Sequence, residues 1–270
     1  MTIPIALTIA GSDSSGGAGI QADLKTFAAC GVYGASVIAA LTAQNTQGVN
    51  AIHQVPADFI TAQIDAVFSD LDVRAVKVGM VSQRPAIEAI VAGLDRWAKG
   101  NVVVDPVMVA TSGDRLLAPD AVDAVRTMLI PRAVLITPNL PEAAALLDAP
   151  LATREGDLIE QGKRLLALGC GAVLLKGGHG EGVESKDYLI REEGVVTLAA
   201  PRIATRNTHG TGCSLSSAIA AGLAKGETLE TAVREAKAYI TAAIAAADRL
   251  NVGHGHGPVH HFYAFDRTPR

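Results

Sequence analysis

Aromatic residues are scarce in this chain, at 4% of its 270 residues. Proteins that bind single-stranded nucleic acid stack the bases on aromatic side chains, so no stacking surface is expected here. The 23 basic and 27 acidic residues leave a formal net charge of −4. Without a run of Lys and Arg, this acidic balance argues against a nucleic-acid partner.

Cysteine is also rare, and long apolar runs are missing. Cys30, Cys170 and Cys213 are odd in number and widely spaced, which argues against a disulfide framework or a zinc site. No apolar run reaches the roughly 18 residues of a membrane span. Residues Met1–Ala10 are apolar but have no basic leader, which favours a buried strand over a signal peptide. We therefore expect a cytoplasmic protein without a membrane partner.

Hydrophobic residues make up 49% of the chain, arranged as short apolar runs between segments of helical period. Such continuous runs are typical of strands covered on both faces. The predicted strands are Ile5–Ala10, Ala35–Ala43, Val73–Val78, Val102–Asp105, Ala133–Thr137 and Ala172–Lys176. The alternation predicts an α/β protein, a mostly parallel sheet between helices. With no linker or repeat, residues 1–270 are expected to form one domain.

The last third of the chain departs from this alternation. Tyr188–Arg191 and Val195–Leu198 flank a Glu-Glu-Gly turn and predict a local hairpin. Two alanine-rich segments, Thr211–Ala224 and Leu229–Arg249, follow and predict helices.

Polar residues follow several of the predicted strands, and ligands of open parallel sheets bind beyond the carboxyl ends of the strands. These residues are Ser12, Asp13, Gln44, Asn45, Asp105, Asn139, Glu142 and Lys176. Any one of them alone is compatible with an ordinary loop. Their coincidence at one edge predicts a binding site.

The segment Asn207–Cys213 (Asn-Thr-His-Gly-Thr-Gly-Cys) opens a predicted helix. Its glycines let backbone amides turn toward an anion, and the helix dipole favours negative charge there. The same dipole is expected to lower the thiol pKa of Cys213. The alternatives are an ordinary glycine-rich helix start, with Cys213 as a small buried residue and His209 as a polar residue of the turn.

A second glycine-rich turn, Gly11–Gly19, contains a match to the dinucleotide-binding pattern, Gly17-Ala-Gly-Ile-Gln-Ala22. That pattern requires an acid or an Arg about 20 residues later. No Asp, Glu, Lys or Arg occurs from Thr26 to Ala57, so the dinucleotide hypothesis fails. A P-loop fails as well, because Asp157 stands where its first glycine should be.

The C-terminal segment Gly253–His261 concentrates four of the seven histidines. Alternating Gly and His without carboxylates or cysteines is weak support for a metal site. The segment is expected to form a packed C-terminal loop.

Taken together, these motifs resemble the bacterial hydroxymethylpyrimidine/phosphomethylpyrimidine kinases of thiamine biosynthesis, in the ribokinase-like superfamily. The matching stretches span nearly the whole chain: Ala6–Phe27, Ala43–Asn45, Asp105–Met108, Ile136–Ala143, Leu175–His179, Asn207–Cys213 and Val252–Phe262. The resemblance implies a ribokinase-like three-layer α/β/α fold.

The resemblance also implies roles for particular residues. Gln44 matches the position that reads the aminopyrimidine edge, and its amide can both donate and accept there. Other residues implied to line the substrate pocket are Gly11, Asp23, Met80 and Val107. The ATP side is implied to consist of Asp105, Asn139, Glu142 and Lys176, with Asp105 and Glu142 holding Mg²⁺. Gly210, Thr211 and Gly212 resemble the anion hole.

Cys213 stands where most ribokinase-like enzymes carry an Asp that acts as general base. The pyrimidine kinases characteristically have Cys, so a thiolate base is one possibility and Asp23 is another. Phosphoryl transfer otherwise depends mostly on positioning and electrostatics.

The function implied is ATP- and Mg²⁺-dependent phosphorylation of 4-amino-5-hydroxymethyl-2-methylpyrimidine and then of its monophosphate. Within enzymes, the alternative is a pyridoxal kinase of the same fold. A different class, a non-catalytic binder of the pyrimidine, is disfavoured by the intact Asp105, Glu142 and Lys176. The family further suggests a homodimer.

Overall fold

The computed structural model describes residues 2–108, 117, 119–177 and 182–265. The described residues form a nine-stranded sheet in the order β3-β2-β1-β4-β5-β6-β7-β8-β9. The strands are β1 (Ile5–Asp13), β2 (Tyr33–Asn45), β3 (Gly48–Gln54), β4 (Val73–Val78), β5 (Val102–Val104), β6 (Leu135–Ile136), β7 (Val173–Lys176), β8 (Glu184–Arg191) and β9 (Gly194–Pro201). The strands from β2 to β7 in the sheet order are parallel, whereas β3, β8 and β9 each pair antiparallel with the preceding strand.

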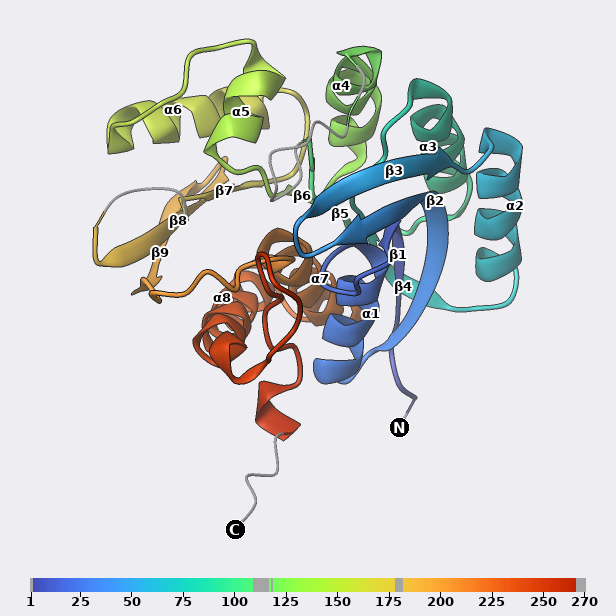
Figure 1. Cartoon of the computed structure of the whole chain (residues 1–270). Coiled ribbons are helices and arrows are strands. Elements are labelled where there is room, and N and C mark those ends of the chain that lie inside the picture. The colour runs from blue at the N-terminus through green and yellow to red at the C-terminus, as the bar shows by residue number, and fades with distance from the viewer. Residues whose placement is uncertain (1, 109–116, 118, 178–181, 266–270) are drawn as a thin grey trace.

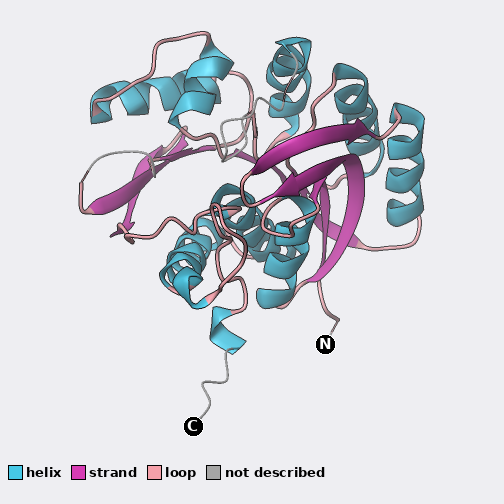
Figure 2. Cartoon of the chain, viewed as in Figure 1, coloured by secondary structure: helices cyan, strands magenta, loops and turns pink. Residues whose placement is uncertain are grey.

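Helices cover both faces of this sheet (Figures 1 and 2). One face carries α2 (Ala57–Phe68), α3 (Arg84–Trp97), α4 (Pro119–Ala124), α5 (Leu140–Leu147) and α6 (Glu155–Leu166). The other face carries α1 (Gly19–Ala29), α7 (Thr211–Ala224) and α8 (Leu229–Ala245). The predicted α/β/α layers with a mostly parallel sheet are confirmed.

Successive side chains of a strand point to opposite faces of the sheet, which explains why there are two hydrophobic cores. Leu7 and Ile9 of β1 pack under the α2–α6 layer, whereas Ala6 packs under the α1, α7 and α8 layer. Strand β5, on the far side of β4, repeats this pattern, with Val104 in the first core and Val103 in the second. Because both faces are buried, such strands have no polar side, and they were predictable as continuous apolar runs.

All six predicted strands are present, and the predicted hairpin is β8 and β9. The helix predicted at Thr211–Ala224 is α7, while α8 ends at Ala245 and a short 3₁₀ turn covers Ala247–Arg249. Strand β3 was not predicted. It is an edge strand with an exposed Ala51 and His53, so it lacks the apolar run that marks the other strands.

Within the described residues, no helix is long and apolar enough to cross a membrane. All three cysteines are free thiols in the structure.

Candidate active site

A cavity of about 660 Å³ opens at the carboxyl ends of the parallel strands. It contains most of the residues predicted for the site: Gln44, Met80, Asp105, Val107, Asn139, Glu142, Lys176, Gly210, Thr211, Gly212 and Cys213. Gln44 and Lys176 lie at the ends of β2 and β7, and the other residues follow β4, β5 or β6 or belong to the start of α7. The sheet therefore brings together residues up to 169 positions apart, from Gln44 to Cys213.

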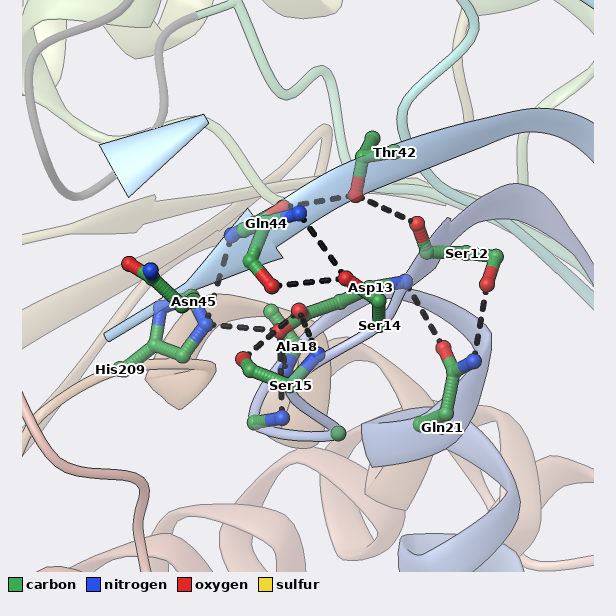
Figure 3. Close-up of polar contacts among 12 residues, drawn as sticks. Ser12, Asp13, Ser14, Ser15, Ala18, Gln21, Thr42, Gln44, Asn45 and His209 are labelled. Atoms are coloured by element: carbon green, nitrogen blue, oxygen red, sulfur yellow. Dashed lines mark hydrogen bonds and ion pairs between the residues drawn. The ribbon is translucent and has the colours of Figure 1, made fainter. Parts of the chain in front are cut away.

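The turn after β1 is organised around the carboxylate of Asp13 (Figure 3). Asp13 accepts hydrogen bonds from the backbone amides of Ser15, Gly17 and Ala18. His209 Nε2 lies 2.8 Å from Asp13 Oδ2, and this nitrogen donates because a carboxylate only accepts. Burial opposes ionisation of Asp13, but these hydrogen bonds, first that of His209, hold its pKa well below the ordinary value.

Gln44 reaches toward His209 from the end of β2 (Figure 3). Thr42 Oγ1 lies 3.1 Å from Gln44 Oε1, and Gln44 Nε2 lies 3.5 Å from His209 Nε2. Since His209 Nε2 carries the hydrogen that Asp13 accepts, two donors face each other there and make no hydrogen bond. The Gln44 amide nitrogen can therefore donate to a ligand in the cavity.

The two glycine-rich turns pack directly against each other. Gly210 has a φ of +81°, and a Cβ at this position would overlap the carbonyl oxygen of Gly17. Only glycine satisfies both the left-handed backbone and this close approach. The contact places the first turn of α7 beside the turn that follows β1.

The first turn of α7 presents backbone amides without intrahelical acceptors. Gly212 lies beside Lys176, since a Cβ at Gly212 would be 3.2 Å from Lys176 Nζ. Thr211 differs from its neighbours, because its amide donates to Thr208 O at 3.2 Å within the turn. The predicted anion hole thus has the helix dipole and the Gly212 amide, while the Thr211 amide is already engaged.

Asp105 and Lys176 form an ion pair in the middle of the cavity. Lys176 Nζ is 2.9 Å from Asp105 Oδ1 and 3.8 Å from Glu142 Oε2. Burial disfavours the charge on Asp105, but Lys176, Lys77 and hydrogen bonds from Lys176 and Thr137 hold its pKa below the ordinary value. Burial also disfavours the charge on Lys176, and the two carboxylates raise its pKa nevertheless. The pair is therefore ionised.

Asn139 and Glu142 form a capping box at the start of α5. The Asn139 side chain accepts from the Glu142 amide at 2.8 Å, and Glu142 Oε2 accepts from the Asn139 amide at 2.7 Å. Burial is the main reason that the pKa of Glu142 rises to about 7, although Lys176 opposes the rise. Glu142 thus both caps the helix and faces the Lys176 ammonium.

Cys213 lines the cavity, but its predicted ionisation is wrong. Burial raises the pKa of the Cys213 thiol to about 11, despite the attraction of Lys77 and a hydrogen bond from the Gly19 amide. The expected effect of the α7 dipole is outweighed by the cost of moving a thiolate out of water. The thiol is neutral at pH 7.

Two further expectations need correction, because Gly11 and Asp23 do not line the cavity. Gly11 lies behind Met80, whose carbonyl accepts from the Gly11 amide at 3.1 Å. Asp23 is fully buried one turn into α1, where it binds Lys77 Nζ through both oxygens at 2.9 Å. Thr8 and Ser217 also donate to Asp23, so this carboxylate is a structural anchor and not a contact for a ligand.

Several features of the cavity were missed by sequence reasoning. Asp13 was expected at the site as a strand-end residue and His209 as a possible polar residue of its turn, but nothing indicated that the two pair. Lys77 had a signal, a charge within the apolar Val73–Val78 run. The pair Lys237–Asp187, 2.7 Å apart, had none, because the two residues come from separate elements. An apolar wall was also missed; its members are Pro201, Ile203, Leu215, Ile240 and Ile244.

The histidine-rich C-terminal segment forms a packed loop, as predicted. No group of three or more His, Cys, Asp or Glu residues suited to a metal ion occurs in the described part of the chain. His261 is buried against Ser214, and burial lowers its pKa to about 4. Gly178 and His179 of the quoted family stretch lie outside the described residues.

Comparison with known proteins gives a consistent result. The profile of the phosphomethylpyrimidine kinase family matches residues 13–260. The hydroxymethylpyrimidine/phosphomethylpyrimidine kinases of Rhizobium meliloti and Escherichia coli are 61% and 56% identical to this chain, each over 96% of its length and over 97% and 98% of their own.

Solved structures are similar across the same length. The ADP complex of Bacillus subtilis pyridoxal kinase superposes with a TM-score of 0.90 at 37% identity, over 98% of this chain and 99% of that chain. Phosphomethylpyrimidine kinase from Clostridium difficile 630 superposes with a TM-score of 0.79 at 46% identity, over 90% and 100%. The predicted ribokinase-like fold is confirmed.

Proposed function

This chain belongs to the phosphomethylpyrimidine kinase family, and from that membership we propose that it is a kinase of thiamine biosynthesis. Its acceptors are 4-amino-5-hydroxymethyl-2-methylpyrimidine and then the monophosphate of that alcohol, and its phosphoryl donor is ATP. The observation that carries the proposal is that a single cavity is lined both by Gln44 and by the first turn of α7. Gln44 offers a side-chain amide to the ring, and a helix start of this kind suits a phosphate.

The pyrimidine lies at the β2 side of the cavity. Gln44 offers an amide to the polar edge of the ring, and Met80 and Val107 offer apolar surface to its faces. Gln44 is oriented from behind by Thr42, so its nitrogen donates to a ring acceptor. This arrangement suits a flat heteroaromatic alcohol.

The nucleotide lies toward β9 and α8, at the opposite end of the sheet. The apolar wall of Pro201, Ile203 and Ile240 suits a purine base. Lys176 and the first turn of α7 lie between the two ends, where they stabilise the charge of the transferred phosphoryl group. Asp105 keeps the Lys176 ammonium in place.

The residues present suit a magnesium ion. Mg²⁺ keeps several waters and takes one or two carboxylates together with substrate phosphates. Asp105 and Glu142 supply two carboxyl groups in the cavity, both within 4 Å of Lys176, and would hold the ion. When bound, the ion neutralises phosphate charge.

Cys213 contacts the acceptor hydroxymethyl group as a neutral thiol. Because its pKa is about 11, it does not remove the hydroxyl proton at pH 7. In a loose transition state the proton leaves late, so positioning by Gln44 and charge stabilisation by Lys176 supply most of the rate. A single kinase domain, a cytoplasmic location and a homodimeric state complete the proposal.

Pyridoxal phosphorylation is the second candidate, favoured by the TM-score of 0.90 with the Bacillus subtilis pyridoxal kinase. The test is incubation with Mg-ATP and each alcohol separately, followed by mass analysis of the products. We expect the pyrimidine mono- and diphosphates to form with a higher kcat/KM than pyridoxal phosphate. Binding of the pyrimidine without turnover would instead identify a non-catalytic binder.

A further inference from the structure

The histidine-rich C-terminal segment packs against two turns that border the site. After α8 the chain returns toward the β2–β3 turn, as the red loop in Figure 1 shows. His260 donates its amide to Ala243 O of α8, and His261 contacts Ser214 of α7 at 3.0 Å. One end of the segment is thus anchored on α7 and α8.

At its other end, the segment binds the turn that follows Gln44. The Gly255 amide donates to Thr46 Oγ1 at 3.1 Å, and the His256 amide donates to Thr46 O at 2.8 Å. Thr46 is two residues beyond Gln44. Any movement of this turn would therefore move the end of β2, from which the Gln44 side chain enters the cavity.

Between these ends, the segment binds the turn that precedes α7. The Gly257 amide donates to Asn207 Oδ1 at 3.1 Å. His209 donates its amide to Gly257 O at 3.0 Å and accepts from the Val259 amide at 3.3 Å. These bonds hold the backbone on both sides of Thr208, directly before Gly210.

The alternation of glycine and histidine has a steric cause. A Cβ at Gly255 would overlap Thr46 O, and a Cβ at Gly257 would overlap Asn207 Oδ1. Glycine is required wherever the backbone lies against these turns. His254 and His256, in contrast, have exposed side chains. The pattern that suggested a metal site is therefore explained by close backbone contact.

We propose that residues Gly253–His261 act as a strap that holds the Gln44 turn and the turn before α7 at a fixed separation. Thr46 and Gly255 are then positioning residues for phosphoryl transfer, although neither touches the substrate. The inference rests on the proposed function, because it assigns the pyrimidine to Gln44 and the phosphoryl group to the start of α7. Loss of one strap contact should loosen both turns together.

The first test replaces Thr46 with Val, which removes the acceptor for Gly255, and with Ser, which keeps it. For Thr46→Val we expect the pyrimidine KM to rise and kcat to fall, with kcat/KM reduced roughly fivefold, the typical effect of one hydrogen bond. Thr46→Ser should match the wild type.

A second variant tests the same contact from the side of the strap. Gly255→Ala should reduce kcat/KM further, because the new methyl displaces Thr46. Gly156→Ala, where no atom lies within 4 Å of the new Cβ, and His254→Ala are the controls.

The second readout is amide hydrogen exchange, which needs no turnover and therefore stands even if the pyrimidine is not the substrate. In Thr46→Val, exchange should accelerate both at residues 44–48 and at residues 207–210. Faster exchange confined to residues 44–48 would overturn the proposal. So would unchanged kcat and KM in a variant whose only change is a lower melting temperature, since the strap would then be purely structural.

Discussion

At the scale of single residues, the site depends on which polar groups are already occupied. Asp13 engages His209, and Lys176 engages Asp105, so these four side chains are fixed before any ligand arrives. Gln44 differs from them, because its amide nitrogen faces a second donor. A ligand that offers a hydrogen-bond acceptor to the Gln44 amide nitrogen would therefore form a new hydrogen bond without breaking an existing one.

The first prediction replaces Gln44 with Leu, which has a similar volume. The variant should fold normally and bind the pyrimidine alcohol more weakly by about 1–3 kcal/mol, because a polar edge of the ring loses its partner. Steady-state KM and calorimetric Kd measure this loss. Gln47→Leu, an exposed position in the same turn, is the matched control. Equal KM values for Gln44→Leu and the control would remove Gln44 from recognition.

The second prediction concerns Cys213, whose thiol pKa is raised to about 11 by burial. A neutral thiol is not a general base, so Cys213→Ser should lower kcat less than about tenfold, short of the loss expected for a true base. Cys213→Asp should be worse than Ser, since it adds a carboxylate at a half-buried position of a site that already holds Asp105. Alkylation of Cys213 by iodoacetamide should remain slow until the pH approaches about 11. The opposite order, with Asp more active than Ser, would restore the general-base hypothesis.

At the scale of elements, the start of α5 combines a helix cap with a carboxyl group that lines the cavity. Glu142 caps the helix through the Asn139 amide, yet burial raises its pKa from 4.5 to about 7. Between these two pH values the folded protein holds a proton that the unfolded chain has lost. Stability therefore falls as pH rises through this window.

The third prediction follows from this difference. Glu142→Gln keeps an acceptor for Asn139 but cannot ionise, so its advantage in unfolding free energy over the wild type should grow from pH 4.5 to above pH 7, by up to about 3 kcal/mol. Urea unfolding in EDTA across this pH range measures the difference in unfolding free energy. Glu160→Gln, at an exposed position of α6, is the control. In activity assays the same variant should need more Mg²⁺ for half-maximal rate. Parallel stability curves for Glu142→Gln and the wild type would show that Glu142 is ionised throughout.

At the scale of the whole molecule, one buried ion pair joins a helix layer to the sheet. Asp23 of α1 binds Lys77 of β4 and accepts from Ser217 of α7, and both charged side chains are fully buried. The nearby Asp23 carboxylate raises the pKa of Lys77 although burial opposes its charge. Lys77 also lines the cavity, so the pair supports the wall of the site.

The fourth prediction is that breaking this pair costs far more than losing a surface pair. Lys77→Met should destabilise the protein by about 3–5 kcal/mol, because Asp23 becomes a buried, uncompensated charge. The double variant Asp23→Asn with Lys77→Met should recover part of this loss. Arg84→Ala, which removes the exposed pair with Glu88, should cost less than about 1 kcal/mol. If the single and double Lys77 variants unfold at the same urea concentration, the two side chains are not coupled.

The sequence alone determined the architecture and the edge of the sheet that carries the site. Continuous apolar runs such as Val102–Val104 mark strands buried on both faces, and glycine-rich turns mark the starts of α1 and α7, because both signals depend on neighbouring residues only. The edge strand β3 escaped this reasoning, since one exposed face gives it no such run.

Only the tertiary structure decided which polar residues meet and which become buried. Asp23 was expected in the pocket and lies inside the protein, and Cys213 was expected to be acidic and is the reverse, because desolvation depends on the whole fold. The pairing of Asp13 with His209, 196 residues apart, left no local trace. The glycines of the segment Gly253–His261 also contact turns that are distant in the sequence. Gly255 contacts Thr46, more than 200 positions away, and Gly257 contacts Asn207, 50 positions away. Such contacts depend on distances between elements, which a local sequence pattern does not contain.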